Sequence, residues 1–284
     1  MKLHVLIRSL EDAQPRLTYQ LLQKACQAQD VELIPIEQEK LVFDSGSKLM
    51  IQDGEAFYRL STGPAQILAE QLLVRPGLST IYEPWRLPLE SSTWEDTLLM
   101  IEKGLPIIDT TFLFAFGSKQ EIDSAVEKTG GYPVVVKYTG LSHGQGVFLC
   151  QDSRDLERVI AGYDKKKYAQ LALRRFIDGA AHLRVVVVDA QAADTIKYHQ
   201  PADDFRTNAA AVPKASPYAS SPEIDKLAVS AAKAYGVKMA GVDILVGQDG
   251  KAWVAEVNNP CNFGRNYLTN GKNLAEDLVR MLCQ

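Results

Sequence analysis

The feature that most constrains the fold is a pair of β-rich runs at residues 240–259, with the sequence AGVDILVGQDGKAWVAEVNN. Asp249-Gly250, between the two runs, is a strong signal for a tight turn. A two-residue turn at this dipeptide pairs Asp243 with Glu256 and places their Cβ atoms about 4.5–5.5 Å apart. Asn258 follows two residues later, on the same face. The sequence therefore predicts an antiparallel hairpin with two carboxylates and one amide on one face.

This set of oxygen-bearing side chains is a candidate metal site. Like charges directly opposite each other destabilise a hairpin unless a cation lies between them. Carboxylate and amide oxygens suit Mg²⁺, which completes its octahedron with water and substrate phosphates. The alternative is that Asp243 and Glu256 are solvated charges on an exposed hairpin. Leu245 and Val254 share the carboxylate face. The opposite face is expected to be core and consists of Val242, Ile244, Val246, Trp253, Ala255 and Val257.

A second candidate site follows the apolar strand expected at residues 133–138, PVVVKY. This run ends in Lys137, and the next residues, TGLSHGQGV, contain Gly144 and Gly146. Glycines let backbone N–H groups turn toward an anion, and a lysine at the strand end places a positive charge beside it. We therefore expect Lys137, Gly144 and Gly146 to contact phosphate groups. A plain hairpin between two strands is the alternative.

The same loop offers a function from a different reaction class. Residues 140–144, GLSHG, match the G-x-S-x-G turn that presents the nucleophile of α/β-hydrolases, here Ser142. That turn requires a helix after it, whereas the following GVFLC is typical of a strand. The pairs available as acid and base do not replace the helix; they are Asp178 with His182 and Asp194 with His199.

Basic residues add to the phosphate hypothesis. With a turn at Ala190-Gln191, the runs at 183–189 and 193–199 place Arg184 opposite Lys197. Two facing cations repel unless an anion such as a polyphosphate lies between them, and an exposed pair with solvated tips is the alternative. In the polar loop DDFRTN, Arg206 is placed to clamp a phosphoryl group and Asn208 to reach the metal or substrate, unless this is an ordinary capped loop. Together these groups are the parts that phosphoryl transfer from Mg-ATP requires.

Composition excludes several classes of function. The 284 residues contain 31 Lys and Arg against 35 Asp and Glu, and no basic block, which argues against binding to nucleic acid or an anionic membrane. No stretch of 18 apolar residues occurs, and the first apolar run breaks at Arg8, so we expect a cytoplasmic protein. The cysteines form no C-x-x-C pair and are expected to be reduced: Cys26, Cys150, Cys261 and Cys283.

The sequence resembles the ATP-grasp superfamily, specifically its RimK-type branch, which includes the ribosomal-protein glutamate ligase. The segments that carry the resemblance are, in chain order, PVVVKY with its glycine loop, RRFI, HLRVVVV, DFRTN, AGVDIL and AEVN. The resemblance covers about residues 90–284. It implies α/β lobes in three segments: a preATP-grasp domain at 1–88, a central ATP-grasp subdomain at 89–165 and a C-terminal subdomain at 166–284. An N-terminal βα unit at 2–36 and a Pro-rich stretch after residue 75 agree with this division.

The resemblance also implies an activity. In this family ATP phosphorylates a substrate carboxylate, and an amine attacks the acyl phosphate to form an amide. By this resemblance Lys137 binds ATP phosphates, and Asp243, Glu256 and Asn258 hold Mg²⁺, or Mn²⁺. Arg206 and Asn208 stabilise charge on the transferring phosphoryl group, and Arg184 resembles the arginine expected near the triphosphate or acyl phosphate. Arg175 and Phe176 fall where the family hinge meets adenine, and His182 falls near the ribose. The expected partners are an amino acid or peptide substrate, with possible homo-oligomers.

Three departures from the family pattern concern nucleotide and acceptor. A second nucleotide-binding lysine is replaced by Ser92 or Thr93, and the hinge glutamine or glutamate by Arg174 and Arg175. The turn after EVN, which borders the acceptor site, is changed at residues 259–262, NPCN. These changes leave open a non-catalytic nucleotide-binding regulatory protein and do not identify the substrates. Further candidate substrate contacts are Arg16, Arg59 and Tyr267.

Overall fold

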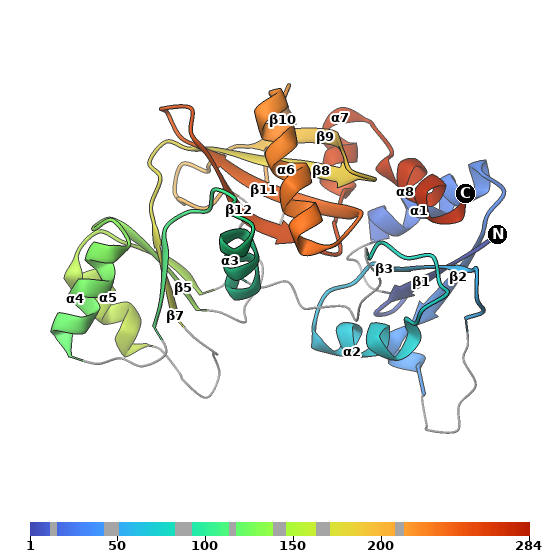
Figure 1. Ribbon diagram of the computed structural model, residues 1–284, viewed down its shortest axis with the longest axis horizontal. Coiled ribbons are helices and arrows are strands. Elements are labelled where there is room, and N and C mark those ends of the chain that lie inside the picture. The colour runs from blue at the N-terminus through green and yellow to red at the C-terminus, as the bar shows by residue number, and fades with distance from the viewer. Residues whose placement is uncertain are drawn as a thin grey trace.

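The computed structural model describes residues 1–11, 16–42, 51–82, 93–113, 118–138, 146–162, 171–207 and 213–284. These ranges form three sheets with helices packed around them (Figure 1). None of the helices within them combines the length and the apolar character that crossing a membrane requires.

The N-terminal lobe contains the predicted βα unit. Its elements are β1 (Lys2–Ile7), α1 (Arg16–Ala28), β2 (Glu32–Glu37), the short 3₁₀ helix η1 (Gln38–Lys40), β3 (Ala56–Arg59) and α2 (Pro64–Leu73). The parallel sheet has the order β2-β1-β3. Leu21, Leu22 and Ala25, which recur at helical spacing in α1, are buried.

The C-terminal end of the chain returns to this N-terminal lobe. Helices α7 (Gly264–Asn270) and α8 (Leu274–Cys283) follow the last strand, and α8 packs against α1 and β1 (Figure 1). One hydrophobic cluster includes Val5 of β1, Val242 of the C-terminal sheet and Leu278 of α8. The first and last segments therefore share a core.

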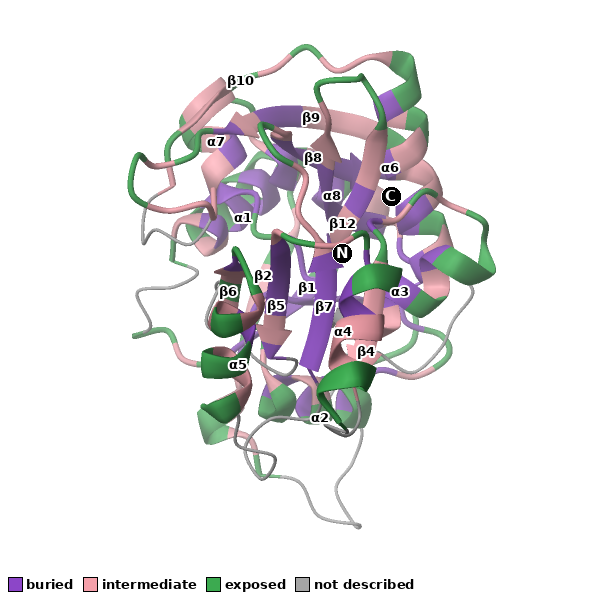
Figure 2. Ribbon diagram, turned by 90° about the vertical axis from the view of Figure 1, so that its left-hand side faces the viewer, coloured by how far each residue is buried: buried purple, intermediate pink, exposed green. Residues whose placement is uncertain are grey.

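The central lobe is an antiparallel sheet of order β4-β7-β5-β6, covered by two helices. Its elements are β4 (Thr110–Leu113), α4 (Lys119–Lys128), β5 (Val134–Tyr138), β6 (Val147–Cys150), α5 (Ser153–Ala161) and β7 (Leu171–Arg175). β5 and β7 are buried along the middle of this lobe (Figure 2). Since β7 belongs to this sheet, the central lobe extends past residue 165, where the sequence analysis placed its end.

The C-terminal sheet has the order β10-β9-β8-β11-β12. Its elements are β8 (Ala181–Val188), β9 (Gln191–Tyr198), β10 (Ala215–Pro217), α6 (Pro222–Tyr235), β11 (Met239–Val246) and β12 (Ala252–Asn258). Helix α6 starts at the Ser221 cap with Pro222 in its first turn, and Gly236 ends it in the left-handed conformation (φ 69°).

The edge strand β12 faces the central lobe. Helix α3 (Thr93–Glu102) and the segment after it run beside β12 (Figure 1). Ile107 forms a parallel bridge with Val254, whose N–H donates to the Pro106 carbonyl at 2.9 Å. The strand that carries Glu256 and Asn258 is therefore covered on its open edge, as sheet edges in native proteins commonly are.

Candidate active site

The predicted pairing of Asp243 with Glu256 is confirmed by the strand register. The predicted two-residue turn is wrong, because residues 247–251 form the turn and the last strand pair is Val246 with Ala252. A β-bulge restores the predicted register: Ile244 pairs with Val254 and Asp243 with Glu256, so Ala255 is the extra residue on β12. The longer turn and the bulge therefore offset each other, so that Asp243 still pairs with Glu256.

The bulge changes which side chains of β12 face the core. Val254, expected on the carboxylate face, pairs with Ile244 and is completely buried in the core cluster. Trp253 and Ala255, expected in the core, are only partly buried. Trp253 instead packs under the Arg175 guanidinium, whose Cζ lies 5.3 Å from the ring centre. The face prediction for these three residues is wrong because one inserted residue reverses side-chain alternation.

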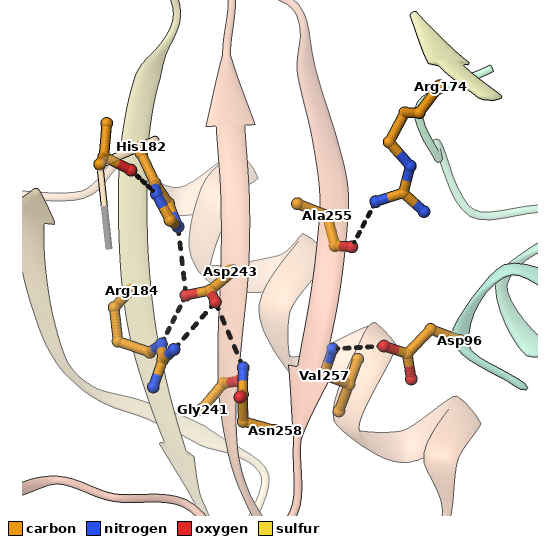
Figure 3. Close-up of polar contacts among 10 residues, drawn as sticks. Asp96, Arg174, His182, Arg184, Gly241, Asp243, Ala255, Val257 and Asn258 are labelled. Carbon is orange, nitrogen blue, oxygen red and sulfur yellow. Dashed lines mark hydrogen bonds and ion pairs between the residues drawn. The ribbon is translucent and has the colours of Figure 1, made fainter. Parts of the chain in front are cut away.

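Asp243 lies at the centre of the polar contacts in Figure 3. Its Oδ1 accepts from Arg184 Nε at 2.5 Å and lies 3.4 Å from His182 Nε2. Its Oδ2 accepts from Arg184 Nη2 at 2.8 Å and from Asn258 Nδ2 at 3.2 Å. Burial raises the pKa of this carboxyl, but the adjacent Arg184 and His182 outweigh burial and hold the pKa below its usual value. Asp243 is therefore an ionised carboxylate that accepts three hydrogen bonds.

Gly241 makes this arrangement possible on β11. A Cβ atom there would lie 2.9 Å from the sulfur of Cys261 and 3.1 Å from Arg184 Cδ. The Gly241 carbonyl also accepts from Asn258 Nδ2 at 3.2 Å. A glycine is needed here because the Arg184 side chain and Cys261 pack directly over the backbone.

The predicted basic pair of Arg184 and Lys197 is wrong. Asp189 and Ala190 form the β8–β9 turn with φ of 47° and 60°, one residue earlier than predicted. A register shift between Val186 and Val187, just before this turn, places Lys197 opposite Leu183 and Arg184 opposite Ile196. Since neighbouring positions face opposite sides of a sheet, Lys197 lies on the other face from Arg184.

Charged side chains of the central lobe approach Glu256 from the other side. Lys137 on β5 and Arg174 on β7 interact electrostatically with Glu256, as does Asp96 on α3. Burial, with a contribution from Arg174, lowers the pKa of Lys137 to about 8. Burial, reinforced by Glu256, raises the pKa of Asp96 well above its usual value. Lys137 and Glu256, predicted as members of one site, are thus close enough to interact electrostatically.

Two of these neighbours were not predicted as site residues. The Asp96 Oδ2 atom accepts from the Val257 N–H at 3.0 Å, and Arg174 Nη1 donates to the Ala255 carbonyl at 2.9 Å (Figure 3). An acidic residue in the first turn of a helix is common, so its sequence position gave no signal. For Arg174 the sequence signal is only its departure from the family hinge pattern.

The predicted hinge and the DFRTN loop lie together. The Phe176 and Phe205 rings meet edge to face, 6.4 Å apart, and Arg175 pairs with Asp109 at 3.2 Å. The Arg206 guanidinium is held by Asp204, with Nη2 2.7 Å from Oδ2. His182 Nδ1 contacts Thr207 Oγ1. Asn208 and Gly144 lie outside the described residues, whereas Gly146 leads into β6, and its carbonyl accepts from the Tyr138 N–H at 2.8 Å.

The three candidate substrate contacts have different environments. Arg59 is 3% exposed and pairs with Glu70, Nε to Oε2 at 2.5 Å, while its Nη2 donates to the Asn259 carbonyl at 3.3 Å. It therefore supports the turn after β12. Arg16 is exposed at the start of α1, and Tyr267 is partly buried in α7.

The hydrolase alternative finds no support in the described residues. Ser142 lies outside them, and the element that follows its loop is strand β6 rather than a helix. Asp194 accepts hydrogen bonds from Asn266 and Asn270, and His199 contacts Ser216. These contacts leave Asp194 and His199 in separate local networks.

Comparison with known proteins places the chain in a family. The model of the RimK-like ATP-grasp domain matches residues 94–282. The chain belongs to the RimK-like ATP-grasp family. A probable alpha-L-glutamate ligase 2 of Pseudoalteromonas atlantica is 30% identical over 186 residues, which cover 65% of this chain and 60% of that protein. The match thus spans less than two thirds of that relative's length.

Solved structures of ATP-grasp proteins share the fold of the whole chain. The ATP-grasp ligase PsnB complexed with minimal precursor gives a TM-score of 0.72 at 17% identity, covering 99% of this chain and 97% of PsnB. A RimK domain ATP-grasp protein from Sphaerobacter thermophilus gives 0.70 at 18% identity, with full coverage of both chains. The predicted ATP-grasp fold is confirmed.

Proposed function

We propose that this RimK-like ATP-grasp protein is an ATP-dependent carboxylate–amine ligase that forms an amide through an acyl phosphate. The observation that carries the proposal is the approach of Lys137, on the central sheet, to Glu256 on the C-terminal sheet, with Asp243 and Asn258 on the same hairpin face. A cation from one lobe and oxygen ligands from another are what binding of a nucleotide triphosphate with its metal requires.

The reaction has two balanced steps. A carboxylate oxygen of the acid substrate attacks the γ-phosphorus of ATP, and the bond from that phosphorus to the bridging oxygen breaks, which releases ADP. The amine nitrogen then attacks the acyl carbon, the bond to phosphate breaks, and the nitrogen loses a proton. Lys137 would hold the nucleotide phosphates, and Arg184 and Arg206, with Asn208, would stabilise charge on the transferring phosphoryl group.

Mg²⁺, when bound, would neutralise charge that develops on the phosphoryl group. Within the described ranges, no three His, Cys, Asp or Glu side chains converge as a metal-binding group, so Asn258 is needed beside the carboxylates. The Glu256 carboxylate has no hydrogen-bond or ion-pair partner among the described residues and fits this role. Asp243 fits through Oδ1, which accepts one hydrogen bond, from Arg184 Nε, and lies 3.4 Å from His182 Nε2 without a hydrogen bond to it.

The nucleotide base and the substrates are also part of the proposal. Arg175, Phe176 and His182 lie near the DFRTN loop and are proposed to line the base and ribose end. The name of the glutamate-ligase relative and the precursor complex of PsnB support an amino acid or peptide as substrate. Because the reaction consumes ATP, we propose the cytoplasm as its compartment. Mn²⁺ as an alternative metal and a homo-oligomeric state are part of the same proposal.

Thermal melting with and without Mg-ATP tests the nucleotide site. Ligand at 100 times its Kd adds about 2.7 kcal/mol to the free energy of unfolding. We expect a shift of several degrees in wild type that is much smaller in Glu256→Gln. A shift of equal size in both proteins would contradict the role of Glu256, and no shift in either would contradict nucleotide binding.

ADP release in a screen of amino acids and peptides then separates a ligase from a non-catalytic nucleotide-binding protein. A ligase releases ADP when both the acid and the amine are present, and Glu256→Gln abolishes the release. Mg-ATP binding without ADP release across such a panel would favour the regulatory alternative.

A further inference from the structure

The main chain on both sides of Glu256 is held by buried side chains from two other elements. The Ala255 carbonyl belongs to the peptide group before Glu256 and accepts from Arg174 Nη1 at 2.9 Å. The Val257 N–H belongs to the peptide group after Glu256 and donates to Asp96 Oδ2 at 3.0 Å. Figure 3 shows these two contacts on the side of β12 away from Asp243. The peptide groups before and after Glu256 are therefore both hydrogen-bonded to side chains from outside its own sheet.

The bulge explains why these contacts exist. In a regular strand, outward N–H groups recur at every second residue. On β12 the outward N–H groups are those of Val254 and Val257, three residues apart, because Ala255 is inserted between them. A bulge disrupts the ladder locally and leaves its extra residue unpaired with the neighbouring strand. Without Arg174 and Asp96, the segment that carries Glu256 would lack ordered partners along its open edge.

Both side chains are held in place by burial, and Arg174 also by a second hydrogen bond. Asp96 is 1% exposed on α3, and Arg174 is 4% exposed on β7. Arg174 Nε also donates to Thr110 Oγ1 on β4 at 3.0 Å, which fixes the direction of the guanidinium. Buried polar groups that bond backbone atoms in this way are costly to remove and hard to move. They fix the position of the strand relative to α3 and the central sheet.

We infer that Asp96 and Arg174 are positioning residues that fix the Glu256 carboxylate for divalent-cation binding. The inference rests on the proposed function, since it takes Glu256 as a metal ligand. Both residues bond the backbone of β12 on either side of Glu256. Each acts through one peptide group, so the central lobe and α3 together determine where the Glu256 carboxylate points. Groups that orient a metal ligand in this way typically contribute 10–100-fold to metal affinity.

The test is a Mn²⁺ titration of the full chain, followed by the loss of the electron paramagnetic resonance signal of free Mn²⁺. The variants are Asp96→Ala, Arg174→Met and the conservative Asp96→Asn, whose amide oxygen can still accept from Val257. Asn266→Ala is the matched control. Asn266 is also fully buried, and its Nδ2 donates to Asp194 Oδ2 at 2.8 Å on β9 rather than to β12. Melting curves establish that each variant folds and report its loss of stability.

We expect Asp96→Ala and Arg174→Met to weaken Mn²⁺ binding about 10–100-fold, and Asp96→Asn to remain within about threefold of wild type. Asn266→Ala should lower stability without changing Mn²⁺ affinity. In a Glu256→Gln background, Asp96→Ala should cause no further loss, because the two residues act through one group. If Asp96→Ala fails to fold, Asp96→Asn and Arg174→Met carry the test, each alone and combined with Glu256→Gln.

Two results distinguish failure of this inference from failure of the proposed function. If Glu256→Gln weakens Mn²⁺ binding but Asp96→Ala and Arg174→Met do not, the positioning role is wrong and the metal role of Glu256 stands. If Glu256→Gln leaves Mn²⁺ affinity unchanged, the metal role of Glu256 is wrong and the positioning role falls with it. Losses that add up in the double variants would show independent structural effects and would also overturn the inference.

Discussion

Arg184 and Asp243 face each other across β8 and β11 and form a two-pronged ion pair, with Nε to Oδ1 at 2.5 Å and Nη2 to Oδ2 at 2.8 Å. Asp243 is 2% exposed, so its charge depends on these partners rather than on water. A proposed metal ligand is thus neutralised by a proposed phosphoryl-binding arginine. When nucleotide and metal bind, the phosphoryl group and the metal would compete for the two members of this pair.

Breaking this pair is expected to destabilise the fold. Arg184→Met leaves a buried carboxylate uncompensated and should lower the free energy of unfolding by about 3–5 kcal/mol. Urea unfolding with and without Mg²⁺ measures the effect, and Mg²⁺ should recover part of the loss because a cation at Asp243 replaces the guanidinium. Asp243→Asn is the control, since its stability should not respond to Mg²⁺. An Arg184→Met variant as stable as wild type would contradict the importance of the pair.

The two lysines predicted to bind nucleotide should differ in their effects. Lys137→Met removes a charge-assisted contact to phosphate and should weaken ATP binding by about 1.5–3 kcal/mol. Lys197→Met should leave the affinity unchanged, because Lys197 lies on the opposite face of its sheet from Arg184. Isothermal titration with ATP and Mg²⁺ compares them. Equal losses in the two variants would show that the strand register does not decide which lysine binds.

Nucleotide affinity should depend on pH through Lys137. Its pKa of about 8 means that the free protein loses this charge as the pH rises above that value. ADP affinity measured between pH 7 and 9.5 should therefore fall above about pH 8. Lys137→Arg stays charged over this range and should remove this part of the dependence. An identical pH profile in wild type and Lys137→Arg would rule out Lys137 as the titrating group.

The lowered pKa of Lys137 should affect stability in the opposite direction from nucleotide affinity as the pH rises. Between about pH 8 and the ordinary lysine value of 10.5, the unfolded chain binds a proton at this position that the folded chain does not. The Lys137 contribution to the free energy of unfolding should therefore increase with pH across this window. The difference in urea midpoint between wild type and Lys137→Met, followed from pH 7.5 to 10, measures it. A difference that stays constant with pH would contradict the shift.

The buried Arg59–Glu70 pair should be structural. Arg59→Met leaves the buried Glu70 with the Tyr82 hydroxyl but without its charged partner and should cost about 3–5 kcal/mol of unfolding free energy, while affinity for ADP stays unchanged. Lys119→Ala removes an exposed pair with Glu157 and should cost less than about 1 kcal/mol. Urea unfolding and ADP titration of both variants provide the test. A loss of ADP affinity in a folded Arg59→Met protein would assign Arg59 a role in binding.

The family and the fold could be predicted from sequence because they rest on local patterns. The βα unit at the N-terminus, the Lys137 strand and the pairing of Asp243 with Glu256 all follow from apolar periodicity and from residues a few positions apart. The pairing survived an incorrect turn because a bulge at Ala255 compensated for it. No residue at that position signals an insertion.

The wrong predictions concern turns and strand registers in which the backbone conformation differs from the one that the local sequence favours. The turn at Asp189-Ala190 takes positive φ at an alanine, which turn preferences do not indicate. A register shift between Val186 and Val187, for which the sequence gives no signal, places Lys197 on the opposite face from Arg184. Asp96 and Val257 are 161 positions apart in the chain, and one sequence gives no signal for such a contact. Long-range contacts at the open edge of β12 became evident only in three dimensions.

The most direct test of the central claim is to trap the acyl phosphate with hydroxylamine. The protein is incubated with Mg-ATP, hydroxylamine and amino acids or peptides in turn, beginning with glutamate, and hydroxamate and ADP are measured together. We predict that at least one acid gives hydroxamate and ADP in equal amounts in wild type and neither product in Glu256→Gln. ADP release without hydroxamate for every acid, or equal hydroxamate in Glu256→Gln, would contradict ligation through an acyl phosphate at this site.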